Sequence, residues 1–139
     1  MCSSDLLLGA LAQRYVENME QCIETAKGDL SQNDHSRDLK ACIVGLLGTD
    51  ARSKAAGMGA ALLATAANNL TLLEVIRERI ADYTAELAAT DADFPRAAIV
   101  TLAVDGLMMR ESLRISSFTE EQRERIVQEL LKIADESYR

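Results

Sequence analysis

The sequence predicts an all-α fold, a compact bundle of about six helices. The 139 residues include one proline and seven glycines, and no stretch alternates apolar and polar residues as a strand would. Apolar residues make up 48% of the chain and charged residues 27%, which is typical of a globular domain. A chain of this length forms a single domain, which we expect to span residues 7–139.

The first two helices are predicted from apolar residues spaced by three and four positions. The first helix should cover about Asp5–Lys27 and end at Gly28, before the polar loop Ser31–Ser36. Its apolar face consists of Leu8, Leu11, Tyr15, Met19, Cys22 and Ala26. The second helix should bury Leu39, Cys42, Ile43, Leu46 and Leu47.

Two further helices are expected in the middle of the chain. Ala55–Ala67 consists of small residues that permit a neighbour to come close, so this helix should be central. The next helix keeps an apolar face through Leu73, Ile76, Ile80, Tyr83 and Leu87.

The last two helices carry the clearest start signals. A carboxylate in Thr90–Asp93 can cap a helix that has Pro95 in its first turn and runs to about Ile115. This helix is apolar around most of its circumference, so we expect one face to pack on its own domain and another on a second subunit. The last helix begins with a capping box, Thr119 to Gln122, and runs to the end.

Charge and cysteine content restrict the possible partners. The net charge is -7 and neither half of the chain is basic, so DNA binding by this chain alone is disfavoured. Cys2, Cys22 and Cys42 form no C-x-x-C pair, which favours buried thiols in the cytoplasm. The uncharged stretch Ala55–Leu73 contains Gly, Thr and Asn and is expected to be a buried helix, with no membrane partner.

Catalytic and metal-binding motifs are not found in the sequence. His35 is the only histidine and lies in the polar loop, where a solvated side chain is expected. We therefore expect no enzymatic activity, no cofactor and no metal site.

Asp105 stands out because it interrupts the apolar run Leu102–Met109. One interpretation places it on a solvent-facing strip with Thr101 and Ser112. The other makes it a polar contact that fixes the register of a dimer, with Arg110 or Arg114 as the cation. Several methionines and tyrosines are compatible either with core packing or with an adaptable cavity; they are Met19, Met58, Met108, Met109, Tyr15 and Tyr83, beside Asn68 and Asn69.

The order of these segments is similar to a known family. The matching segments are Ala66–Leu70, Leu72–Ile80, Phe94–Val100, Ala103–Leu107 and Thr119–Arg125. Over about Leu8–Glu136 the chain resembles the C-terminal, ligand-binding and dimerisation half of a TetR-type transcriptional regulator. The most specific part is the helix with Asp105-Gly106, followed by a short loop and the Thr-Glu-Glu start of the last helix.

The resemblance implies a homodimer in which Phe94–Ile115 and Thr119–Tyr138 form a four-helix bundle with their symmetry mates. Expected interface residues are Ile99, Ala103, Gly106, Leu107, Arg110, Ile126, Leu130 and Ile133. It also implies a repressor whose earlier helices surround a small apolar or amphipathic effector, and the expected ligand-binding residues are Met19, Cys22, Cys42, Met58, Asn69 and Tyr83. Effector binding would shift the first helix and so change the spacing of two DNA-binding domains.

The start of the chain departs from the family pattern. A basic helix-turn-helix domain is expected before Leu8, so the full-length protein would bind DNA only through that missing domain. Residues 1–6 are expected to be a non-native leader. A rival hypothesis is a free-standing acidic adaptor that binds a different protein through Phe94–Tyr138.

Overall fold

The computed structural model describes residues 3–49, 51–52, 61–62, 64, 66–67 and 73–138. Over these residues the protein is all-helical and contains no strand. Five helices are defined: α1 (Ser3–Gly28), α2 (Arg37–Leu47), α5 (Glu74–Ala88), α6 (Phe94–Ser112) and α7 (Glu120–Glu136). The expected helix at Ala55–Ala67 falls largely outside the described residues, so the prediction of six helices stays a prediction.

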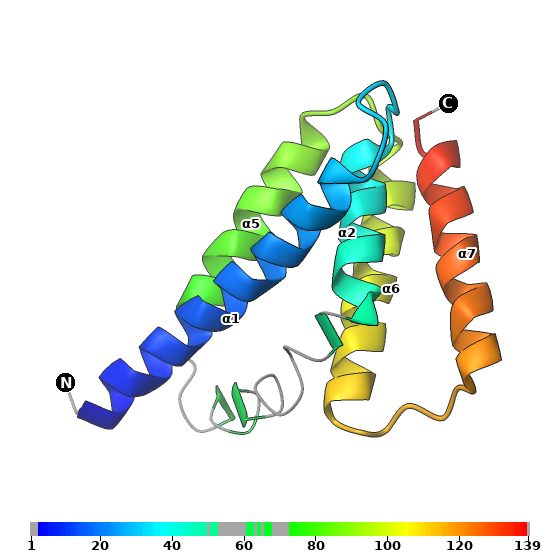
Figure 1. The fold of residues 1–139 in the computed structure, drawn as a ribbon. Coiled ribbons are helices and arrows are strands. Elements are labelled where there is room, and N and C mark those ends of the chain that lie inside the picture. The colour runs from blue at the N-terminus through cyan, green and yellow to red at the C-terminus, as the bar shows by residue number, and fades with distance from the viewer. Residues whose placement is uncertain are drawn as a thin grey trace.

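The helices form two groups that share α2 and α6 (Figure 1). In the first group, α2, α6 and α7 each contact the other two. In the second group, the contacts run in a ring from α1 to α2, then to α6, to α5 and back to α1. No Cα atom of α1 lies within 8 Å of one in α6, and the same holds for α2 and α5. The second group is therefore a ring of four helices. Helices on opposite sides of this ring do not contact one another through their backbones, so the centre of the ring lies between them.

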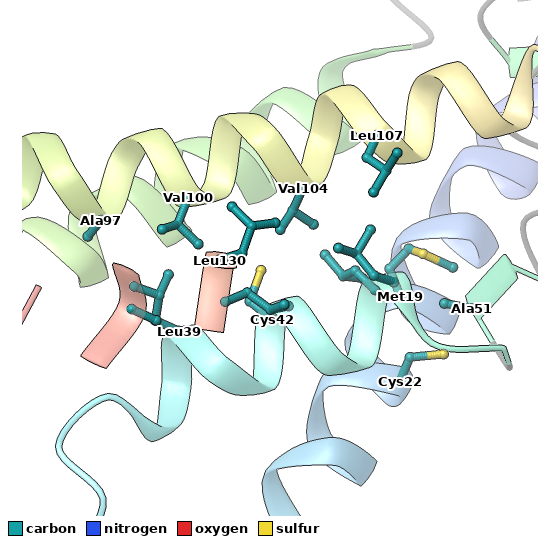
Figure 2. Close-up of a cluster of buried hydrophobic side chains, with 14 of the residues drawn as sticks. Met19, Cys22, Leu39, Cys42, Ala51, Ala97, Val100, Val104, Leu107 and Leu130 are labelled. Carbon is teal, nitrogen blue, oxygen red and sulfur yellow. The ribbon is translucent and has the colours of Figure 1, made fainter. Parts of the chain in front are cut away.

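The core lies between α2 and α6. The apolar face predicted for α2 is completely buried, because Leu39, Cys42, Ile43, Leu46 and Leu47 all face the other helices. Figure 2 shows Val100, Val104 and Leu107 projecting from α6 toward α2, with Leu130 of α7 beside them.

Helix starts agree closely with the sequence signals. Asp93 caps α6 by accepting a hydrogen bond from the Arg96 backbone N–H at 3.3 Å, and Pro95 lies in the first turn. Thr119 caps α7: its hydroxyl accepts from the Gln122 backbone N–H at 3.1 Å, and the Gln122 side chain accepts from the Thr119 N–H at 3.0 Å. The predicted capping box is confirmed.

The end of α6 differs from the prediction. The helix ends at Ser112 rather than near Ile115. Arg114 adopts a left-handed backbone with φ of 56°, and the Ile115 N–H donates to the carbonyl of Arg110 at 2.9 Å. This is the turn that normally ends a helix at glycine, and it was not predicted because an arginine occupies the position.

The packing of α1 on α2 depends on a glycine. A Cβ atom at Gly45 would lie 2.7 Å from the Cys22 carbonyl oxygen and 2.8 Å from the Ile23 Cα. The backbones of α1 and α2 are therefore closer together here than they could be if position 45 carried a Cβ atom. This contact places α1 directly against α2 in the four-helix ring.

Candidate functional site

A cavity of about 550 Å³ lies within the four-helix ring. Its wall includes residues of α1, α2, α5 and α6, together with Leu62 and Leu73. The helical lining residues are Tyr15, Val16, Met19, Glu20, Ile23, Cys42, Leu46, Ile76, Arg79, Ile80, Tyr83, Thr84, Ala98, Thr101, Leu102, Asp105, Met108, Met109 and Ser112. The volume lies within the range of about 300–1,000 Å³ that is typical of small-molecule sites.

Most of this wall is apolar. Aliphatic side chains and methionines from all four helices contribute to it, and the long flexible Met19 and Met108 adapt readily to the shape of a ligand. Two hydroxyl groups in the wall are engaged with their own helices: Thr101 donates to the Ala98 carbonyl at 2.9 Å, and Thr84 donates to the Ile80 carbonyl at 2.8 Å. These threonines present their methyl groups without leaving a polar group unsatisfied.

Two buried polar groups meet at the α2–α5 side of the wall. Burial raises the pKa of the Cys42 thiol to about 11. A hydrogen bond with Tyr83 lowers this pKa, but its effect is smaller than that of burial. Burial also raises the pKa of the Tyr83 hydroxyl, and Cys42 adds to this effect. Both groups are therefore protonated and neutral at neutral pH, which disfavours the thiolate form of Cys42 that a nucleophile requires.

One ion pair closes the ring between α1 and α5. The Arg79 Nε lies 2.5 Å from the Glu20 Oε1, and the Arg79 guanidinium lies 6.0 Å from the centre of the Tyr83 ring. Because each charge has an opposite partner, the two together add no net charge to the cavity wall.

Asp105 is the third charged residue of the wall. Its side chain is exposed, and no hydrogen bond or ion pair joins it to another described residue. Partial removal from water among apolar neighbours raises the pKa of the Asp105 carboxyl. Burial raises the pKa of the Tyr15 hydroxyl on α1, and the negative charge of Asp105 raises it further.

The comparison with family models decides the class. Residues 37–135 match the model of the tetracyclin repressor-like C-terminal domain. This chain belongs to that TetR-like family. No curated protein and no solved structure matches the chain.

Membership of the TetR-like C-terminal family sets the general role. Domains of this family are regulatory rather than enzymatic, and they generally dimerise and bind small-molecule effectors. In the described part of the chain, no three His, Cys, Asp or Glu side chains are grouped to hold a metal ion. Within the same residues, no helix has the length and apolar character needed to cross a membrane.

The structure brings part of the predicted ligand-binding set of this TetR-like domain together. Met19, Cys42 and Tyr83 line the cavity. Cys22 does not line it, because this side chain is buried in the core where α1 packs on α2. Met58 and Asn69 lie outside the described residues.

Sequence reasoning missed most of the contribution of α6 to the cavity. One of the two interpretations of Asp105 places it with Thr101 and Ser112 on a solvent-facing strip, and in the structure these three residues line the cavity wall. Their spacing of four and seven residues did indicate a shared face. The pattern could not show whether that face borders bulk water or a cavity.

The residues predicted for the dimer interface differ in how deeply they are buried. Leu107 and Leu130 are buried in the core of the chain itself, so they are not available at its surface. Ile126 and Ile133 are partly buried against the same core, and Arg110 lies 5.0 Å from the centre of the Phe118 ring. Ile99 is 59% exposed, Ala103 and Gly106 are partly exposed, and nothing lies within 4 Å of a Cβ built at Gly106.

Proposed function

We propose that this chain is the effector-sensing and dimerisation module of a TetR-family transcriptional repressor. The observation that carries the proposal is the cavity inside the four-helix ring, in a chain whose family generally binds small effectors. Its predominantly apolar wall favours a small apolar or amphipathic effector, whose apolar surface would leave water on binding.

The geometry suggests how an effector would act. Because α1 and α6 make no close backbone contact, a ligand in the cavity between them would contact two helices that do not pack directly on one another. A ligand that binds one α1 position more tightly than another shifts the population toward that position. In the regulator, α1 would transmit this shift to the DNA-binding domains and so change their spacing.

The dimerisation part of the proposal rests on the third face of α6. One face of this helix packs in the core and a second lines the cavity. The remaining face, named here the α6 stripe, carries the exposed Ile99 and Leu113 and the partly exposed Ala103 and Gly106. The exposed Leu102 and Met109 lie where this face meets the cavity wall. Contiguous apolar surface of this kind marks an interaction site, and the small Ala103 and Gly106 would permit a symmetry-related α6 to approach closely.

An association experiment tests the α6 stripe. Sedimentation of the wild-type chain at micromolar concentration should show a dimer, and Ile99→Glu should give a monomer because a charge at the stripe would be buried without a partner. Val44→Glu is the matched control, since Val44 is also exposed but lies on α2. A wild-type monomer would instead favour an adaptor that uses the stripe for a different protein.

A binding experiment tests the cavity. The neutral dye Nile red should bind with increased fluorescence, and Ala98→Trp should abolish the increase by filling the cavity. The control is Ala85→Trp, which adds the same side chain to an exposed position of α5 that does not line the cavity. Equal dye binding by both variants would show that the cavity is not the ligand site.

A further inference from the structure

The charges on the described residues of the cavity wall do not balance. Glu20 and Arg79 neutralise one another across the α1–α5 side, at 2.5 Å. Asp105 lies on the α6 side with no ion-pair partner among the described residues. Counted over the described residues, this mainly apolar cavity wall therefore carries one uncompensated negative charge.

Helix geometry separates Asp105 from the α6 stripe. Adjacent residues of an α-helix are turned by about 100°, so Asp105 lies well to one side of Gly106 at the middle of the stripe. The residues on the same side as Asp105 are Ala98, Thr101, Leu102, Met108, Met109 and Ser112, all of which line the cavity. The nearest predicted cation, Arg110, is turned toward Phe118. Asp105 is thus directed to the cavity contents rather than to the centre of a dimer contact.

The entry of a ligand changes the surroundings of this carboxylate. An effector that fills the apolar cavity removes water from Asp105, and an ionised carboxylate without water or a partner is strongly destabilised. A neutral ligand would leave that charge unpaired or force its protonation. A cationic ligand would replace the lost water with an opposite charge, which is the arrangement that buried carboxylates require.

The neighbours of Asp105 suit the same ligand. The Tyr15 side chain lines the same cavity from α1. An aromatic ring in the wall can stabilise an organic cation through its negative face, in addition to the charge pair with Asp105. The methionines and aliphatic residues of the wall would enclose the apolar body of the ligand.

We propose that the effector is an apolar organic monocation, such as an alkyl- or arylammonium, whose charged group binds Asp105 while its apolar body fills the four-helix ring. This rests on the proposed function, since it assumes that the cavity is the effector site. Asp105 would thereby select a cation over a neutral or anionic molecule of the same shape.

Three naphthalene derivatives of similar shape provide the test: naphthylmethylammonium, naphthalenemethanol and naphthoate. Each competes with Nile red for the wild-type chain, for Asp105→Asn and for Asp82→Asn. Asp82→Asn is the matched control because it removes the same charge from an exposed position of α5 outside the cavity wall.

The cation should bind the wild type and Asp82→Asn about tenfold or more tightly than the neutral alcohol, which corresponds to about 1.4 kcal/mol. In Asp105→Asn this preference should disappear, while Nile red and the alcohol bind as before or more tightly. Equal affinity of cation and alcohol for the wild type, or a preference that survives in Asp105→Asn, would overturn the proposal and leave the cavity as the effector site. Failure of Nile red itself to bind would overturn the proposed function.

Discussion

The two helix groups of this protein differ in how their centres are filled. Where α2, α6 and α7 meet, each helix contacts the other two, and the residues between them, such as Val100, Val104 and Leu130, are buried. Where α1, α2, α5 and α6 form a ring, opposite helices do not touch and a cavity of about 550 Å³ remains. Three mutually contacting helices leave no space at their centre, whereas four in a ring leave a space that large side chains would have to fill.

Polar contacts show the same contrast. At one end of α7, the Lys40 Nζ lies 2.7 Å from Asp34 and 2.5 Å from Asp135. At the other end, Arg123 pairs with Glu111 at 2.5 Å and donates to the Leu47 carbonyl at 2.7 Å. Helix α7 is therefore held to α2 at both ends. In the ring, Lys27 of α1 pairs with Asp38 of α2 at 2.6 Å, and among the described residues one ion pair, Glu20–Arg79, joins α1 to α5.

The largest effect is expected from Arg123, whose side chain is only 11% exposed. Arg123→Met should destabilise the fold by about 3 kcal/mol, because it leaves the Glu111 carboxylate short of a partner in a poorly solvated place. Urea unfolding measures the change. Arg125→Met, on the exposed side of α7, is the control and should have little effect. A small loss in both variants would show that α7 is not held by this contact.

Adjacent alanines on α6 test the difference in filling most directly. Ala97 is fully buried in the core, and Ala97→Leu should cost about 2 kcal/mol by overpacking. Ala98 lines the cavity, so Ala98→Leu should leave the unfolding free energy unchanged or raise it. Thermal unfolding of the two variants compares them. Equal destabilisation would mean that the ring is as tightly filled as the three-helix group.

Two glycines distinguish an occupied helix surface from an open one. Gly45→Ala should destabilise by about 1 kcal/mol, because the clash with the α1 backbone exceeds the gain in helix propensity. Gly106→Ala meets no atom of its own chain and should stabilise the monomer by up to about 1 kcal/mol. If the proposed dimer brings two α6 backbones together there, Gly106→Ala should also weaken dimerisation in sedimentation. Unchanged dimerisation would place the contact elsewhere.

The smallest effect concerns acid stability. Hydrogen bonding to Lys40 lowers the pKa of both Asp34 and Asp135 below the usual value near 4. A carboxyl whose pKa is lower in the folded state stabilises the fold above its unfolded pKa, and this contribution is lost as the pH falls through the folded pKa. Burial lowers the pKa of Lys40, but the carboxylates of Asp34 and Asp135 together raise it by more. The contribution of the charged Lys40 to stability is therefore lost only in strong alkali.

The measurement compares unfolding midpoints of the wild type and Lys40→Met between neutral pH and about pH 3. Their difference should shrink as the pH falls, because acid removes the partners of Lys40. Lys132→Met is the control, since Lys132 and Glu129 form an exposed pair at 3.8 Å that should add little at any pH. A difference that persists at low pH would show that Lys40 acts through its aliphatic chain.

Much of the fold was predictable because its signals are local. The apolar face of α2, the Asp93 cap and the Thr119–Gln122 capping box depend on residues within a few positions of one another. The end of α6 was less predictable, since Arg114 takes a backbone conformation that favours glycine. The candidate site was predictable only in part: Met19, Cys42 and Tyr83 were assigned to a cavity, whereas Asp105 was assigned to solvent or to a dimer contact.

The sequence by itself determined the helices, their capped starts and the family, because these depend on local spacing and on the order of segments. Only the tertiary structure decided which face of α6 meets which surroundings. Leu107 and Asp105 are two residues apart on one apolar helix, yet one is buried in the core and the other lines a cavity. The difference arises because α2 packs directly on α6 while α1 does not reach it, and no local pattern encodes the distance between two helices.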